Sequence, residues 1–183
     1  MTFHTKMEEK IKWLFFNETL RRWHFEDIVV ESGMSRERVN YFLKSLTKLK
    51  LILRILPKGK MPYYIANKDS AKFRYEKRIY GLHYLEKAGF FELVGTQGWV
   101  QIAILFGSFA MGTWNKDSDI DLFVYGKGRF DLAPVEHKLN RDISLFRYDT
   151  PSALSRELDP NLIPNIIKGF HIKGNPFGVL IHA

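Results

Sequence analysis

Residues 100–121 constrain the fold of this 183-residue chain more than any other segment. The run 100–106 is short, β-branched and almost wholly apolar, which predicts a buried central strand. Gly107-Ser108 ends that run, and residues 119–125 then read as a second strand, in which successive side chains point to opposite faces. We therefore expect the second half of the chain to be a mixed β-sheet flanked by helices, within a chain of the α+β class.

Two carboxylates lie on one face of the second predicted strand. Asp119 and Asp121 are two residues apart, so their side chains point to the same side. Next to an apolar stretch they repel each other and lose hydration unless a cation joins them, and such oxygen clusters suit Mg²⁺. Gly107 lets the backbone approach a phosphate, and Ser108 adds a hydroxyl donor. The alternatives are carboxylates that accept from loop amides and a serine that caps a helix.

This arrangement resembles a known enzyme family. Gly107-Ser108, ten residues, then Asp119-x-Asp121 is similar to the signature of the DNA polymerase beta-like nucleotidyltransferases. The run 105–122 looks like the minimal branch of that family, and the resemblance extends over about residues 90–175. The family uses a third carboxylate from a later strand, and Asp142, in the strand-like run 141–147, matches it. Rival acidic residues fall in expected loops or helices: Asp131, Glu136 and Asp149.

The resemblance implies a role for each matching residue. Asp119 and Asp121 would bind two Mg²⁺ ions, and Asp142 would complete the site and help to activate the acceptor hydroxyl. Gly107 and Ser108 would hold the β- and γ-phosphates of an NTP, with ATP favoured as the donor. The metals would stabilise the attacking and leaving oxygens at the α-phosphate, and pyrophosphate would leave.

Two positions depart from the family pattern. Relatives often carry Arg where Met111 stands and an acidic residue where Thr113 stands. A transcription regulator or antitoxin-type protein, whose nucleotidyltransferase domain senses nucleotide or a protein partner without turnover, therefore stays open as an alternative. Members of this branch often act as antitoxins that adenylylate a helical toxin partner, so the resemblance makes a protein acceptor plausible beside RNA or a small molecule.

Basic charge is concentrated in the first half of the chain. Residues 1–95 carry 19 Lys and Arg against 11 Asp and Glu, whereas the remainder is balanced at nine each. The segment 33–60 contains eight basic residues and one acidic residue. Such asymmetry indicates a half that binds a polyanion, joined to a second domain. A solvated basic face is the alternative.

Helices are expected over residues 5–18, 24–31 and 35–49, followed by a hairpin of strands at 51–55 and 62–65. The third helix has Ser35 as its N-cap and an apolar stripe: Val39, Phe42, Leu43, Leu46 and Leu49. Residues 5–67 resemble the winged helix of bacterial and archaeal regulators. We divide the chain into a winged-helix domain at 1–68, a linker helix region at 69–95 and a nucleotidyltransferase domain at 96–183.

A recognition helix places its N-terminal residues at base edges in the major groove of double-stranded DNA. Here those residues are Arg36, Arg38 and Asn40, since Arg can bond guanine and Asn adenine. The other predicted DNA-binding residues, mostly near phosphates, are Tyr41, Lys44, Lys48, Lys58 and Lys60. A two-fold DNA site would require a homodimer. A winged helix used only for protein contacts or dimerisation is the competing interpretation.

The composition excludes several classes of site. The chain has no Cys, which removes disulfides, thiolate zinc sites and a Cys nucleophile. No two of its six His residues are spaced i, i+4 as a metal-binding pair. No apolar run approaches about 20 residues, and residues 1–12 lack the apolar core of a signal peptide, so we expect a cytoplasmic protein without a membrane span.

Overall fold

The computed structural model describes residues 3–180, and these form two compact units. The first unit comprises residues 1–77 together with 114–116, and the second comprises 78–113 and 117–183. Residues 1–2 and 181–183, the outer ends of the two predicted domains, lie outside the described part. Within the described part, no helix combines the length and apolarity that a membrane crossing requires.

The first unit contains helices and a small antiparallel sheet. Its strands are ordered β1-β3-β2, with Trp23 opposite Tyr64 and Ile52 opposite Ala66. The hairpin β2–β3 was predicted, whereas the two-residue strand β1 was not. The elements of this unit are α1 (Phe3–Asn17), β1 (Trp23–His24), α2 (Phe25–Ser32), α3 (Arg36–Lys48), β2 (Ile52–Ile55), β3 (Tyr63–Ala66) and the first turns of α4 (Ala71–Ala88).

Helix α3 follows its apolar stripe closely. The four stripe residues from Val39 to Leu46 are buried, each with at most 2% of its surface exposed. Leu49 was predicted to join them but is 38% exposed, because it caps the helix and the chain turns there into Lys50 with a positive φ of 57°. The polar faces of α3 are left in solvent, as the amphipathic pattern requires.

The core of the first unit is strongly aromatic and includes a residue from far along the chain. Trp114 is fully buried there, with its ring centre 5.6 Å from that of Trp13 and 6.5 Å from that of Phe16. Its indole N–H donates to the carbonyl oxygen of Lys77 at 3.3 Å, and the Lys77 ammonium lies 4.8 Å from the ring centre. The amide of Lys116 donates to the carbonyl oxygen of Asn17 at 2.9 Å. Residues 114–116, in the spacer between Ser108 and Asp119, thus belong to the first unit.

The second unit is built on a four-stranded mixed sheet of order β6-β5-β4-β7, which confirms the predicted α+β class. β5 runs parallel to β6, and β4 is antiparallel to both β5 and β7. Its remaining elements are α5 (Phe90–Gly95), β4 (Val100–Phe106), α6 (Gly107–Met111), β5 (Ile120–Gly126), α7 (Ala133–Leu139), β6 (Ile143–Tyr148), α8 (Pro151–Glu157), η1 (Pro160–Leu162), α9 (Ile163–Ile167), β7 (Phe170–Lys173) and α10 (Phe177–Leu180).

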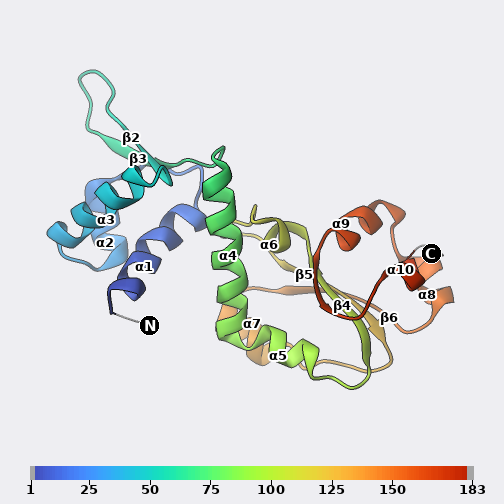
Figure 1. Ribbon diagram of the computed structural model, residues 1–183. Coiled ribbons are helices and arrows are strands. Elements are labelled where there is room, and N and C mark those ends of the chain that lie inside the picture. The colour runs from blue at the N-terminus through green and yellow to red at the C-terminus, as the bar shows by residue number, and fades with distance from the viewer. Residues whose placement is uncertain (1–2, 181–183) are drawn as a thin grey trace. The chain divides into compact units, whose positions relative to one another are not determined.

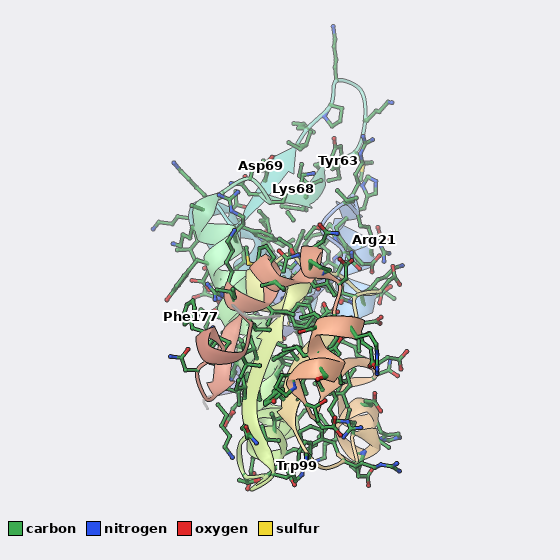
Figure 2. All side chains as sticks on the ribbon, turned by 90° about the vertical axis from the view of Figure 1, so that its right-hand side faces the viewer. Arg21, Tyr63, Lys68, Asp69, Trp99 and Phe177 are labelled. Atoms are coloured by element: carbon green, nitrogen blue, oxygen red, sulfur yellow. The ribbon has the colours of Figure 1, made fainter. Side chains whose placement is uncertain are left out.

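One face of this sheet is covered by the C-terminal helices. Alternate residues of β4 and β5, such as Ile104 and Phe123, pack with Leu154, Ile166 and Leu180 from α8, α9 and α10. Figure 1 shows these helices on one side of the sheet and α7 on the other. In Figure 2, Trp99 marks the end of the sheet at which β4 begins. The candidate site lies at the opposite end of β4.

The boundary between the two units falls inside α4. The predicted linker helix region at 69–95 contains α4 and α5, and α4 contributes residues up to 77 to the first unit. Phe73 and Leu85 of α4 are buried. Tyr80 and Tyr84 are only half-buried. The phenol of Tyr84 instead donates a hydrogen bond to the carbonyl oxygen of Leu139, which keeps its polar end at the surface of the core.

Candidate active site

Three chain segments reach the same edge of the second sheet because of the way its strands pair. In the antiparallel pair, Phe106 lies opposite Asp121, so the end of β4 meets the start of β5. In the parallel pair, the amide of Ile120 donates to the carbonyl oxygen of Asp142 at 3.0 Å, so β5 and β6 start at the same edge. Backbone pairing therefore brings together the Gly-Ser turn, the acidic pair and Asp142.

The three predicted carboxylates occupy adjacent positions at this edge. Asp121 is the second residue of β5 and lies opposite Ser144 of β6. Asp119 precedes the strand, and Asp142 precedes β6 in the same way. β5 begins one residue later than predicted, because its first ladder bond is the one from Ile120 to Asp142. Asp121 shares its face of the sheet with Phe123, the face that the C-terminal helices cover.

Asp121 is the carboxyl group with the most perturbed surroundings. It is half-buried, whereas Asp119 and Asp142 are exposed. Burial, and in second place the negative charge of Asp119, raise the pKa of Asp121 above its ordinary value. Among the described residues, its carboxylate has no hydrogen-bond or ion-pair partner. A neighbouring cation would relieve both the desolvation and the repulsion.

The chemistry of Asp119 and Asp121 fits a divalent metal ion. Two hard oxygen donors side by side, one of them desolvated and unpaired, are the kind of ligand that Mg²⁺ takes together with substrate phosphates. Across residues 3–180, however, no three His, Asp or Glu side chains are gathered closely enough to hold an ion. Asp142 shares the edge of the sheet, but its carboxylate is not gathered with the other two.

The rival acidic residues take no part in this cluster. The Glu136 carboxylate accepts from the amide of Ile143 at 2.9 Å, which ties α7 to the start of β6. Asp131 lies before α7 and Asp149 follows β6, both exposed. Their places in the fold agree with the expectation that they lie in loops or helices.

Gly107 is required by its position against Asp121. Its φ is +65°, which favours glycine, and a Cβ at this position would lie 1.9 Å from Asp121 Oδ2. Ser108 follows it at the start of α6, half-buried, and its carbonyl oxygen accepts from the amide of Thr113 at 3.0 Å. Among the described residues, the Ser108 hydroxyl makes no hydrogen bond. The backbone at Gly107 thus lies so close to the Asp121 carboxylate that only glycine leaves room for it.

The two positions that depart from the family pattern lie at the end of α6. Met111 is 56% exposed, and Thr113 is also exposed. Between them Gly112 ends the helix with a φ of +73°. An exposed methionine cannot supply the charge that an arginine would bring to a phosphate.

Arg141 is a residue of this edge that the sequence analysis missed. Its guanidinium Nη1 donates to the carbonyl oxygen of Ser118 at 2.8 Å, and its Cζ lies 5.3 Å from the ring centre of Phe109. Burial lowers the pKa of Arg141, while the Tyr84 phenol, Asp117 and Asp119 act in the opposite direction. The available signal was a cationic residue immediately before the predicted third carboxylate.

The predicted DNA-binding residues lie on the exposed faces of the first unit. Arg38, Asn40, Tyr41, Lys44 and Lys48 are exposed along α3. Arg36 is exposed as well, but its Nη1 is 2.6 Å from a Glu26 carboxylate oxygen, and its Cζ lies 5.2 Å from the ring centre of Phe25. Arg36 is therefore already paired with residues of α2, whereas the predicted contact with a base requires an available guanidinium.

Lys58 and Lys60 lie in the turn between β2 and β3. Both are exposed, and the amide of Lys60 donates to the carbonyl oxygen of Pro57 at 3.2 Å. Figures 1 and 2 show this loop projecting from the sheet of the first unit, beyond Tyr63. The exposed side chains of Leu56 and Met61 flank the two lysines.

Most of the second unit is similar to one known protein family. Residues 92–174 match the family model described as "Nucleotidyltransferase domain". This range contains the Gly-Ser turn, the acidic pair and Asp142. Over residues 92–174 the chain is therefore similar to nucleotidyltransferases, which are enzymes. No protein of curated function matches the chain significantly in sequence.

Solved structures give more distant similarities. One is a mutant of the toxin-antitoxin MntA-HpeT, with 18% identity and a TM-score of 0.34 over 58% of this chain and 80% of that chain. Another is a toxin-antitoxin crystallised with AMP-PNP, with 21% identity and a TM-score of 0.35 over 59% of this chain and 80% of that chain.

Proposed function

We propose that this enzyme transfers a nucleoside monophosphate, AMP from ATP, to a hydroxyl or phosphate acceptor. The observation that carries the proposal is the meeting of Gly107, Asp121 and the Asp142 backbone at one edge of the sheet. Phosphate-binding backbone and metal-binding carboxylates are needed within a few ångströms of each other for transfer at an α-phosphate. The pairing of three separate segments at one edge of the sheet supports the proposal.

Each residue has a distinct role in the proposed reaction. Gly107 leaves room for phosphate oxygens beside the backbone, and the Ser108 hydroxyl donates to them. Asp119 and Asp121 hold Mg²⁺, with Asp142 as the third carboxylate. When bound, two such ions would stabilise the attacking and leaving oxygens of an in-line displacement. Asp142 accepts the acceptor proton as the acceptor oxygen bonds to the α-phosphorus and the bond to pyrophosphate breaks.

The test is transfer of label from each α-³²P NTP, with Mg²⁺ and a lysate of the source cells. We expect a labelled product with the wild type and none with Asp119→Asn or Asp121→Asn. Asp149→Asn is the matched control, because it changes an exposed carboxylate outside the site. The identity of the labelled molecule distinguishes protein, RNA and small-molecule acceptors. A helical toxin partner would appear as a labelled protein.

Unchanged transfer in Asp121→Asn would contradict the assignment of the metal site.

The exposed Met111, in place of an arginine, favours the second possibility that the domain binds nucleotide and senses it without turnover. In that case the wild type would bind Mg·ATP but label no acceptor. Circular dichroism of each variant shows that folding is retained.

We further propose that the first unit is a winged helix that binds double-stranded DNA. The supporting observation is that α3 keeps several basic and amide side chains exposed while the hairpin holds Lys58 and Lys60 exposed in its loop. Fluorescence anisotropy with a 20–30 bp duplex tests this, since affinity should fall steeply as salt rises. Salt-independent affinity, or none, would favour a unit that contacts proteins. A palindromic site would indicate a homodimer.

A further inference from the structure

Arg141 contacts the segments that carry the candidate site. It precedes Asp142 directly in the chain. Its Nη1 donates at 2.8 Å to the carbonyl oxygen of Ser118, the residue before Asp119. Its guanidinium also lies over the ring of Phe109, the residue after Ser108, with 5.3 Å from Cζ to the ring centre. One side chain therefore touches the turn before the acidic pair and the helix after the Gly-Ser turn.

The Arg141 side chain is itself held in place. It is half-buried, and the phenol oxygen of Tyr84 on α4 accepts a hydrogen bond from it. The Tyr84 hydroxyl donates in turn to the carbonyl oxygen of Leu139, two residues before Arg141. A planar guanidinium fixed at several donors loses little further freedom for each bond it makes. The contact with Ser118 is thus made by a preorganised group.

We propose that Arg141 is the positioning residue of the acidic site: it fixes the turn of residues 117–119 against α6 and the start of β6. This inference rests on the proposed function, because it concerns how the carboxylates are held for metal-bound nucleotide. Asp119 is exposed and lies before the strand, so the ladder of β5 alone does not fix its side chain. The bond to the Ser118 carbonyl anchors the peptide that precedes it.

A purely electrostatic role for Arg141 makes the opposite prediction. Its positive charge lies near Asp117 and Asp119 and reduces the negative potential there. If charge were its only effect, removing it would make the acidic pair attract a cation more strongly. If Arg141 positions the turn, removing it weakens metal-dependent nucleotide binding. The direction of the change therefore separates the two roles.

The experiment compares Arg141→Met, Arg141→Lys and Arg147→Met with the wild type. Arg147 lies on β6, the strand that Arg141 precedes. It is exposed and donates to the carbonyl oxygen of Gly128 at 2.7 Å, away from the site. Calorimetric titration with Mn²⁺ and α,β-methylene-ATP, which cannot lose pyrophosphate, measures binding. We expect Arg141→Met to bind about 10-fold more weakly, because small displacements in a site have large effects. Arg141→Lys should lose less affinity, and Arg147→Met should bind as the wild type does. Binding as tight as wild type, or tighter, in Arg141→Met would overturn the proposal.

A second readout does not depend on nucleotide. Hydrogen exchange of the amides of residues 117–121 in the free protein should be faster in Arg141→Met and unchanged in Arg147→Met, with similar melting temperatures. If the wild type binds no Mn²⁺–nucleotide, the proposed function fails, but exchange still decides the role of Arg141. Unchanged exchange at residues 117–121 would refute that role even if the enzyme is active.

Discussion

The two units of this chain present their candidate functional groups in different ways. In the first unit, Arg38, Lys44 and Lys48 come from a single helix and lie exposed along it. In the second, Gly107 and Asp121 are far apart in sequence and meet only because β4 and β5 pair. A surface of the first kind follows from helical periodicity, whereas a site of the second kind follows from strand register. We therefore expect the first to tolerate the loss of one member and the second not to.

The largest expected effect tests whether Trp114 belongs to the core of the first unit. Trp114→Ala should lower the free energy of unfolding by about 3–5 kcal/mol, because it empties a fully buried site in the core of the first unit. Urea denaturation measures the loss. Leu20→Ala, at a position that is 79% exposed, is the control and should change little. A loss below about 1 kcal/mol would mean that the spacer does not stabilise the first unit.

Next in size is the effect of closing the space beside Asp121. Gly107→Ala should reduce transfer by about 10²-fold, because the new methyl group meets the carboxylate and displaces it. Gly89→Ala is the matched control: its φ is also positive, at +85°, but no atom lies within 4 Å of the added carbon. Transfer kinetics of both variants are compared at equal folded fraction. Equal losses would show that backbone strain, and not the contact with Asp121, is responsible.

A smaller, graded effect is expected on the helical surface. Lys44→Ala combined with Lys48→Ala should reduce the slope of log affinity for duplex DNA against log salt by roughly 2, since each lost phosphate contact removes about 0.9. Anisotropy titrations at several salt concentrations measure it. Lys168→Ala, an exposed lysine of the second unit, should leave the slope unchanged. An unchanged slope in the double variant would remove α3 from the DNA-binding surface.

The smallest effect concerns pH. The pKa of Asp121 is raised in the folded state, so the folded protein binds the proton more tightly than the unfolded chain does. The free energy of unfolding therefore falls as pH rises from the ordinary pKa to the raised one. Above the raised pKa, the whole loss of stability from the charged, half-buried Asp121 is present. Asp121→Asn should raise the melting temperature by a few degrees at pH 7 and not at pH values below the ordinary pKa. Thermal scans with Asp131→Asn as control measure this, and added Mg²⁺ should reduce the difference by stabilising only the wild type.

The parts of the fold that depend on local pattern were predicted from the sequence. The apolar stripe of α3, the hairpin and the strands β4, β5 and β6 all follow from spacing and residue type. The strand β1 was not predicted, because two residues carry too short a pattern. The pairing of β7 with β4 joins segments about 70 residues apart in the chain, and no periodicity encodes such a contact.

Within the site, the acidic pair and the Gly-Ser turn were predicted from the sequence, but the groups around them were not. Gly107 was recognised from its motif, while the reason for it, the contact with Asp121, needed the register of β4 and β5. Arg141 was missed because a lone arginine before a strand has no pattern. The place of Trp114 in the first unit was missed because an isolated tryptophan in a spacer does not show which core it enters.

The spacer between Ser108 and Asp119 also bears on how such a chain can change by insertion and deletion. Surface loops normally accept added or lost residues at little cost. Here both ends of the spacer belong to the second unit, and its middle, residues 114–116, belongs to the first. A residue gained or lost on either side of Trp114 would have to be absorbed by the Gly-Ser turn or by the turn before Asp119. The length of this loop is therefore under the kind of constraint that usually applies to a strand in a sheet.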